Sequence, residues 1–298
     1  KKIRNRRNLM AVVKADGYGH GAVQVSRAAL KSGADWLGVA IPEEGQQLRE
    51  AGIEVPILVV GLIQPAEAYK VVKFRLGQAA ASIELMEALD YEAGKASTTV
   101  NVHVKVDTGM GRIGIKPDEV VSFMHKVNKY KNIYLEGVFS HFSSADEKDK
   151  AFSEHQIKLF EGVIQELRAA GIEVPKKHIA NSAAVLDLPQ SYYDMVRPGI
   201  MIYGLYPSND VSRSIELKPA MTFKTKVSEI KEVPPGTPIS YGRKFVTKKR
   251  TKVATLPVGY ADGYNRLLSN RGEVVIKGRR VPVIGTVCMD MCMLDTSS

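Results

Sequence analysis

The sequence has 298 residues, of which 44% are hydrophobic and 25% charged, and 42 Lys and Arg against 32 Asp and Glu give a net charge of +10. These values are typical of a globular protein with one large domain or two, and they exclude a mainly disordered or fibrous chain. Because no zinc-finger or RNA-binding signature accompanies it, the positive charge favours an anionic small ligand over nucleic acid. No apolar run is long enough to predict a transmembrane helix.

Short apolar runs alternate with amphipathic segments over about the first 205 residues. Eight of these runs read as strands: Leu9–Val13, Trp36–Ala40, Ile57–Gly61, Gln78–Ser82, Val100–Val106, Leu135–Ser140, Lys177–Ala180 and Met195–Arg197. Segments with helical periodicity lie between them: Ala22–Lys31, Glu43–Ala51, Ile83–Ala93, Asp118–Lys129 and Phe152–Ala170. Alternating strands and helices predict a parallel sheet, and eight units predict a closed (β/α)₈ TIM-type barrel in the α/β class. The eighth unit is the weakest, because little helical pattern follows Arg197.

The sequence pattern changes near Leu217, where prolines and short runs of alternating hydrophobicity replace the helical periodicity. Four runs read as strands: Thr222–Val233, Lys252–Pro257, Glu273–Ile276 and Val281–Asp290. We therefore predict two domains, a barrel over residues 1–217 and an incomplete, mainly β domain over residues 218–298.

Two basic clusters stand out, Lys1–Arg7 and the group Lys248, Lys249, Arg250 and Lys252, and we expect both to be solvated. Cys288 and Cys292 lack the spacing of a disulfide framework or a zinc site, which fits a reducing compartment and hence the cytoplasm. The basic start has no apolar core of a secretory signal. Both ends look cut, and we expect this sequence to be part of a longer chain.

The first strand runs into VKADGYGHGA, in which Lys14 ends an apolar stretch and a glycine-rich loop opens the next helix. Three interpretations are open. The loop is an ordinary turn with an incidental lysine, or it is a dinucleotide fingerprint, since Gly17, Gly19 and Ala22 match G-x-G-x-x-A and Glu43 follows at a suitable distance. The third is a Schiff-base lysine, because barrel enzymes place their chemistry at the C-terminal ends of strands. Eight consecutive units argue against a dinucleotide fold, and no Walker A motif is present.

Other polar residues lie at or just after the ends of the later strands: Lys105 near the end of the fifth and Arg112 after it, His141 after the sixth, Ser182 after the seventh, and Arg197 at the end of the eighth with Gly199 and Ile200 after it. Each of these residues alone is more often structural. A lone histidine is usually a core residue whose ring nitrogens are hydrogen-bonded within the protein, and an Asn-Ser pair such as Asn181-Ser182 usually caps a helix. Their shared position at strand ends favours one site, in which Ser182 and the backbone after Gly199 could cradle a phosphate.

The runs AVVKADGYGHGA, VKVDTGMGRIG, HIANSAA, VRPGIMIYGLYP, ISYGRKF, LPVGYADGY and GTVCMDMCMLD are similar, in order and approximate spacing, to those of bacterial alanine racemases. The resemblance covers nearly the whole chain. It implies pyridoxal 5'-phosphate as cofactor, an amino acid as substrate, and D-alanine for peptidoglycan as product, with no metal, nucleic acid or membrane as partner.

The resemblance also implies roles for individual residues. Lys14 would hold the cofactor as a Schiff base and act as one catalytic base, and Tyr241 of a partner subunit in a homodimer would be the second. The remaining cofactor-side residues are Tyr18, His141, Ser182, Arg197, Gly199 and Ile200, of which Tyr18, Ser182, Gly199 and Ile200 would surround the phosphate. Arg112 and Met289, the latter also from the partner, would contact substrate, and Lys105 matches a position that is often carbamylated. The family's first strand and a further pocket tyrosine would lie outside this sequence.

Two bases on opposite faces suit racemisation, because one removes the α-proton and the other returns a proton without moving the substrate. Two rival functions remain at this stage. A serine or broad-specificity amino-acid racemase would share the architecture, and a non-catalytic pyridoxal-phosphate-binding barrel would share the lysine but lack the second domain. A dinucleotide oxidoreductase is a more distant alternative.

Overall fold

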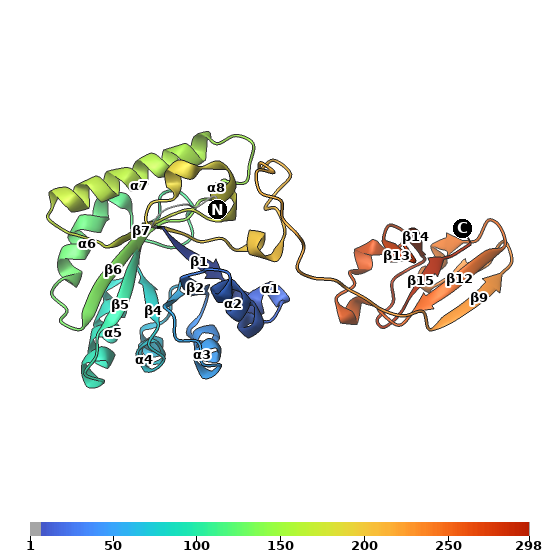
Figure 1. The fold of residues 1–298 in the computed structure, drawn as a ribbon, viewed down its shortest axis with the longest axis horizontal. Helices are drawn as coiled ribbons and strands as arrows, with labels where there is room; N and C mark the ends of the chain where they lie inside the picture. The colour runs from blue at the N-terminus through green and yellow to red at the C-terminus, as the bar shows by residue number, and fades with distance from the viewer. Residues whose placement is uncertain (1–6, 298) are drawn as a thin grey trace. The chain divides into compact units, whose positions relative to one another are not determined.

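The structure is a computed structural model that describes residues 7–297, and its contacts divide the chain into two units, Lys1–Met221 and Thr222–Ser298. Figure 1 shows the first unit as a set of strands with helices packed around their outside.

The first unit is a parallel barrel in which the strands follow the order β7-β6-β5-β4-β3-β2-β1-β8. Its strands are β1 (Asn8–Val12), β2 (Trp36–Val39), β3 (Ile57–Val59), β4 (Gly77–Ala80), β5 (Val100–Lys105), β6 (Ile133–Phe139), β7 (Lys176–His178) and β8 (Met195–Val196). The last gap, between β7 and β8, is bridged where the N–H of Asp194 donates to the Lys177 carbonyl and that of Arg197 to the Ala180 carbonyl. The predicted eight-stranded barrel is thus confirmed, and it is nearly closed.

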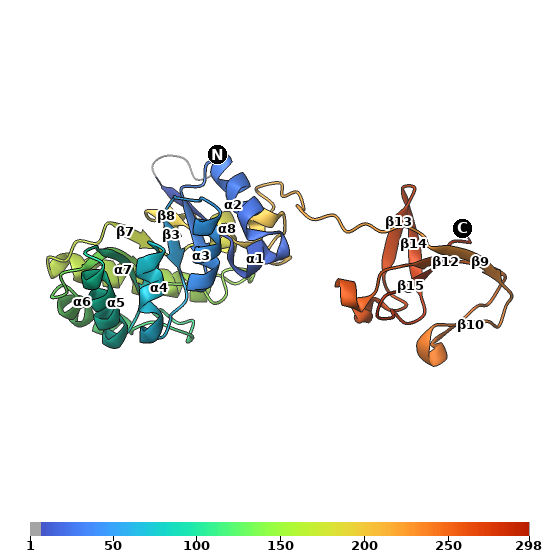
Figure 2. The ribbon, with the colours of Figure 1, turned by 90° about the horizontal axis from the view of Figure 1, so that it is seen from below.

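Helices connect successive strands and cover the barrel (Figure 2). They are α1 (Lys14–Gly19), α2 (Ala22–Lys31), α3 (Pro42–Glu50), α4 (Ala68–Lys73), α5 (Ile83–Lys95), α6 (Val120–Val127), α7 (Ala151–Ala169) and α8 (Ser182–Asp187). Short 3₁₀ turns are η1 (Pro65–Glu67), η2 (Pro117–Glu119), η3 (Pro189–Ser191) and η4 (Ile200–Tyr203). The eighth unit ends in η4 instead of an α-helix, as its weak pattern predicted.

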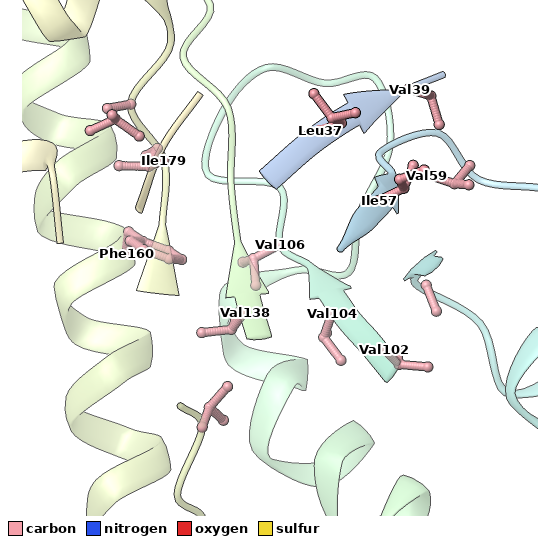
Figure 3. Packing of buried hydrophobic residues seen from close by; sticks show 14 of the residues in the cluster. Leu37, Val39, Ile57, Val59, Val102, Val104, Val106, Val138, Phe160 and Ile179 are labelled. Carbon is pink, nitrogen blue, oxygen red and sulfur yellow. The ribbon is translucent and has the colours of Figure 1, made fainter. Parts of the chain in front are cut away.

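The core lies between the strands and this layer of helices, where apolar side chains from both interdigitate (Figure 3). Val102 and Val104 of β5 and Val138 of β6 are fully buried. Phe160 projects from α7 onto the strands and is also fully buried, whereas Phe152, two turns earlier on the same helix, is 47% exposed. Burial of this apolar surface is the main term that holds the helices against the barrel.

The second unit is a five-stranded antiparallel sheet with a short hairpin. Its strands are β9 (Glu229–Val233), β10 (Pro238–Ile239), β11 (Phe245–Val246), β12 (Thr251–Leu256), β13 (Glu273–Ile276), β14 (Arg279–Ile284) and β15 (Cys292–Asp295), and its 3₁₀ turns are η5 (Tyr241–Arg243), η6 (Tyr260–Asp262) and η7 (Arg266–Leu268). The large sheet has the order β13-β14-β15-β12-β9. A small core that includes Ala254, Val283 and Leu294 lies on one side of it.

Two of the four strands predicted for this unit are wrong in extent. The strand expected over Thr222–Val233 starts only at Glu229, because its partner β12 is short and pairs Thr255 with Glu229 at its end. The strand expected over Val281–Asp290 ends at Ile284, because Gly285 turns the chain with a φ of +78°.

The basic group at Lys248, Lys249, Arg250 and Lys252 is exposed, as expected. The other basic cluster, Lys1–Arg7, lies outside the described residues except for Arg7, which donates to the Tyr193 carbonyl at 2.9 Å. Within residues 7–297, no helix is long and apolar enough to cross a membrane.

We predict that Phe160→Ala lowers the free energy of unfolding of the barrel by about 3–5 kcal/mol, because the surrounding residues cannot close the cavity that it leaves. Phe152→Ala on the same helix is the matched control, with an expected loss of about 1 kcal/mol or less. Urea unfolding followed by circular dichroism measures both losses, and equal losses would contradict the packing described here.

Candidate active site

The C-terminal ends of the barrel strands surround a cavity of about 350 Å³. It brings together nine residues singled out from the sequence: Lys14, Tyr18, Lys105, Arg112, His141, Ser182, Arg197, Gly199 and Ile200. They come from the C-terminal ends of five different strands and from the loops that follow them. These segments are distant in sequence and meet only because the strands are parallel and the sheet closes.

Lys14 stands at the start of a left-handed turn, not of an ordinary glycine-rich loop. Ala15, Asp16, Gly17 and Tyr18 have φ values between +51° and +61°. This conformation costs roughly 1–2 kcal/mol for each residue that carries a side chain. The turn is held where the N–H of Ala22 donates to the Asp16 carboxylate at 2.8 Å and where the Tyr18 ring packs on Tyr203, with centroids 4.7 Å apart. Lys14 and Tyr18 both line the cavity as a result.

Arg197 is a buried guanidinium, 5% exposed, which forms no ion pair with a carboxylate of residues 7–297. It donates instead to Nδ1 of His178 at 2.7 Å, to Nδ1 of His141 at 3.1 Å and to the Ser140 carbonyl at 2.8 Å. Arginine has no acceptor, so both imidazole nitrogens must accept. Burial lowers the pKa of Arg197 to about 9, which leaves it charged at neutral pH.

The two histidines beside Arg197 are neutral at pH 7. Burial, and then the charge of Arg197, hold the pKa values of His141 and His178 well below the usual range. For His141 the further cations Lys105, Arg112 and Lys14 add to the effect. A neutral His141 whose Nδ1 accepts from Arg197 carries its proton on Nε2, where it can be donated.

Lys105 is 2% exposed, and its ammonium donates to the Val106 carbonyl at 2.8 Å. The centroid of the Phe139 ring is 5.4 Å from Nζ of Lys105 and 5.4 Å from Cζ of Arg197, so both groups contact this ring. Burial, Arg197 and Arg112 together lower the pKa of Lys105 to about 7, although Asp107 opposes the shift. A large fraction of this lysine is therefore the free amine at neutral pH.

Ser182 and the segment after β8 form a polar pocket beside Tyr18. The Ser182 hydroxyl oxygen accepts from the N–H of Gly199 at 2.8 Å and of Met201 at 3.4 Å, so its O–H stays free to donate. Ile200 begins η4, and the first N–H groups of a helix have no acceptor within it. A Cβ on Gly199 would lie 2.6 Å from the Tyr18 hydroxyl oxygen, so only glycine leaves room there.

Arg112 lies on an ordered loop after β5. One Asp107 carboxylate oxygen accepts from the N–H groups of Gly109, Met110 and Gly111 at 2.9–3.1 Å. The Arg112 side chain is exposed and reaches the cavity. Four basic side chains thus line one cavity: Lys14, Arg112, Arg197 and the partly protonated Lys105. They give the cavity an electrostatic preference for anions such as phosphates and carboxylates.

Tyr241 and Met289, the other two predicted site residues, belong to the second unit. Tyr241 is 71% exposed and Met289 54% exposed. The Thr286 hydroxyl donates to the Tyr241 carbonyl at 2.8 Å, and the N–H of Ala261 donates to the Met289 carbonyl at 3.0 Å. Two loops of this unit thus hold both residues at its surface.

Three residues that shape the site were not singled out from the sequence. The Glu44 carboxylate accepts from the N–H of Ala15, the residue after Lys14, and Nδ1 of His178 accepts from Arg197. Gln156 of α7 is fully buried and donates to the His141 carbonyl at 3.1 Å. The only local signal was for Glu44, which is the third residue of a helix that begins with proline, a favoured capping position.

The fold and the site define a class of protein: a barrel enzyme with a lysine at the end of its first strand, an anion-binding cavity around it and an appended β domain. Comparison with known proteins identifies the family. The alanine racemase N-terminal domain model matches residues 1–207, and the C-terminal domain model matches residues 220–298.

Individual similar proteins are also alanine racemases. The alanine racemase of Halothermothrix orenii is 50% identical over 289 residues, which cover 97% of this chain and 76% of that protein. Alanine racemase 2 of Caldanaerobacter subterraneus is 46% identical, with coverage of 99% and 76%. The solved alanine racemase of Clostridium difficile 630 superposes with a TM-score of 0.94 at 39% identity, over 100% of this chain and 79% of that one.

The chain therefore belongs to the alanine racemase family, and its activity is racemisation, an isomerase reaction. One further similar structure is a histidine racemase from Leuconostoc mesenteroides, with a TM-score of 0.91 at 28% identity, over 99% of this chain and 79% of that one. The family match and the eight-stranded barrel contradict the interpretation of the Gly17 loop as a dinucleotide fingerprint, which is therefore wrong.

The lowered pKa of Lys105 predicts a pH-dependent stability. The folded state binds this proton only below about pH 7, while the unfolded chain holds it to above pH 10, so the cost of burying Lys105 shrinks as the pH rises between those values. In CO₂-free buffer, the unfolding free energy of the wild type relative to Lys105→Met should rise by about 1.4 kcal/mol per pH unit between pH 7.5 and 10. The exposed Lys116→Met is the control, and a flat difference for Lys105→Met would contradict the burial effect.

Proposed function

We propose that this protein interconverts L-alanine and D-alanine with pyridoxal 5'-phosphate as cofactor, in the cytoplasm, and so supplies D-alanine for peptidoglycan. The observation that carries the proposal is the cavity itself, where Lys14 meets Arg112, Arg197 and Lys105 beside the polar pocket of Ser182 and Gly199. The free cysteines Cys288 and Cys292 fit a reducing compartment.

The residues of the cavity fit this cofactor. Ser182 has a free O–H, Ile200 a free N–H and Gly199 no side chain, and these donors beside Tyr18 suit a phosphate group. Lys14 would hold the cofactor's aldehyde through its amine. When bound, the cofactor would supply the electron sink that makes the α-proton of an amino acid removable.

Arg197 would face the pyridine nitrogen. The observed bonds to His178 and His141 fix the plane of its guanidinium, and a group with only donors disfavours a proton on the nitrogen opposite to it. A less protonated ring is a weaker electron sink, which favours simple proton return over side reactions such as transamination.

Arg112 would bind the substrate carboxylate, and Lys14 and Tyr241 would move the proton on opposite faces of the substrate. A phenol with an ordinary pKa near 10 needs help to act as a base at neutral pH. The free Nε2–H of His141, backed by Arg197, could stabilise the phenolate of Tyr241. By the family resemblance, this tyrosine is Tyr241 of the partner subunit in a homodimer, and Met289 of the partner subunit would contact the substrate.

Lys105 would be carbamylated. The ammonium first loses one proton to give the neutral free amine. The amine nitrogen then forms a new N–C bond to CO₂, one C=O bond of CO₂ becomes C–O⁻, and a second proton leaves the nitrogen to solvent, so that a cation has become an anion. A pKa near 7 makes the free amine available, and an anion beside Arg112 would replace repulsion with attraction.

A broad-specificity amino-acid racemase is the second candidate, because a histidine racemase shares the fold. Racemisation rates measured with alanine, serine and histidine decide between the two. A non-catalytic cofactor-binding barrel is disfavoured by the second unit, which carries Tyr241 and Met289.

Lys14→Ala should lower the racemisation rate by at least about 10²–10⁴-fold and abolish covalent cofactor binding, because one residue provides both the base and the attachment point. Lys31→Ala, an exposed lysine in the same βα unit, should leave both unchanged. Polarimetry measures the rate, and mass spectrometry after borohydride treatment locates the cofactor. Retention of both properties in Lys14→Ala would refute the assignment.

Shared sites predict complementation between two inactive variants, Lys14→Ala and Tyr241→Phe. In a mixed dimer, one site receives both defects and the other receives neither. Random pairing after joint unfolding and refolding should therefore restore about a quarter of the wild-type activity. If each site were built within one chain, the mixture would stay inactive.

The control replaces Tyr241→Phe with the double variant Lys14→Ala/Tyr241→Phe, whose mixture with Lys14→Ala contains no intact site. Differently tagged chains verify that mixed dimers have formed. Their presence without activity would overturn the shared site and leave the fold unaffected.

Carbamylation of Lys105 predicts a carbamate carbon signal in the ¹³C NMR spectrum of protein equilibrated with ¹³C-bicarbonate. The signal should be absent from Lys105→Met and present in Lys116→Met. No signal in folded wild-type protein at saturating bicarbonate would refute the modification.

A further inference from the structure

Glu44 joins the loops after two neighbouring barrel strands. It is the third residue of α3, and its Oε1 accepts from the N–H of Ala15 at 2.6 Å. Its Oε2 accepts from the N–H of Ala40 at 2.6 Å and, more weakly, from that of Ile41 at 3.4 Å. One carboxylate therefore ties the residue after Lys14 to the C-terminal end of β2.

The position of this contact matters because the turn that it holds is strained. Ala15 is the first left-handed residue of the turn, and it directly follows Lys14. A backbone bond from the N–H of Gly17 to the Val13 carbonyl, at 2.8 Å, spans the Lys14 end of the turn. Bonds from the N–H of Gly21 to the Asp16 carbonyl and from that of Ala22 to the Asp16 carboxylate secure its far end. Glu44 is the side chain that secures the Lys14 end.

We propose that Glu44 is a positioning residue, whose carboxylate holds the left-handed turn against β2 so that Lys14 and Tyr18 both face the cavity. The catalytic consequence rests on the proposed function of Lys14, whereas the holding of the turn does not. Glu44 has no contact with the cavity and acts only through the backbone.

The geometry requires a carboxylate. Each oxygen of Glu44 accepts from a different loop, so both ends of the carboxyl group must be acceptors. A glutamine has one acceptor oxygen, and its amide N–H₂ would face the N–H of either Ala15 or Ala40. Glu44→Gln therefore keeps the shape and breaks one of the two bonds.

The neighbouring residue supplies a matched control. Glu43 is exposed, forms its ion pair with Lys70 of α4, and makes no contact with the turn. Glu43→Gln makes the same chemical change one residue away.

Hydrogen exchange of the full chain without cofactor tests the holding role. In Glu44→Gln, the Ala15 amide should exchange at least about tenfold faster than in the wild type, while amides of β5 and α7 keep their rates. Glu43→Gln should match the wild type throughout. An unchanged Ala15 rate would overturn the proposal, and so would an equal acceleration in β5 and α7, which would mean general destabilisation.

Covalent capture tests the consequence for Lys14. The rate at which added pyridoxal 5'-phosphate becomes borohydride-trapped on the Lys14 peptide should fall about tenfold in Glu44→Gln and stay unchanged in Glu43→Gln. In the saturated enzyme, kcat should fall while KM for alanine changes little, because Arg112 lies on another loop. Normal capture and kcat in Glu44→Gln would overturn the positioning role. If the wild type captured none at Lys14, the proposed function would fail instead, and hydrogen exchange would still decide whether Glu44 holds the turn.

Discussion

Closure of a parallel barrel is the constraint on which the rest of this structure depends. Because all eight strands run in one direction, their C-terminal ends meet at a single rim, and the loops that follow them must share that space. Lys14, Lys105, His141, Ser182 and Arg197 are far apart along the chain, yet they line one cavity for this reason.

The rim concentrates positive charge, and the surrounding residues adjust to it. Arg197 is buried without a carboxylate partner among residues 7–297, and neutral imidazoles and backbone carbonyls serve as its acceptors. Burial, and then the same charge, lower the pKa values of His141, His178 and Lys105, which keeps both histidines unprotonated and shifts Lys105 toward the free amine. An anionic ligand would relieve this repulsion, which makes the electrostatics of the cavity consistent with a phosphate and a carboxylate bound together.

The same site contains a strained backbone segment, the left-handed turn that follows Lys14. Left-handed residues after Lys14 are unfavourable in isolation. They persist because Glu44 from α3 and Tyr203 from η4 hold them, together with Asp16 of the turn itself. Strain of this kind requires the folded barrel, since Glu44 and Tyr203 lie far from Lys14 in sequence.

The sequence by itself determined the barrel, the appended β domain and most of the residues at the rim, because alternating periodicity and polar residues after apolar runs are local signals. It missed the left-handed turn, since KADGYGHG reads as an ordinary glycine-rich loop. It also extended two strands of the second unit too far, because strand length depends on a partner such as β12 that lies elsewhere in the chain.

Only the tertiary structure decided which side chains support the site. Gln156 and His178 have no distinctive local pattern, and the pattern at Glu44 indicates only a helix cap. Each of the three matters through a hydrogen bond to a residue at least 15 positions away. The pKa of Lys105 likewise follows from its burial beside Arg197 and Arg112. Contacts and charges of this kind come into existence when the strands close into a barrel, so a linear pattern of residues cannot specify them.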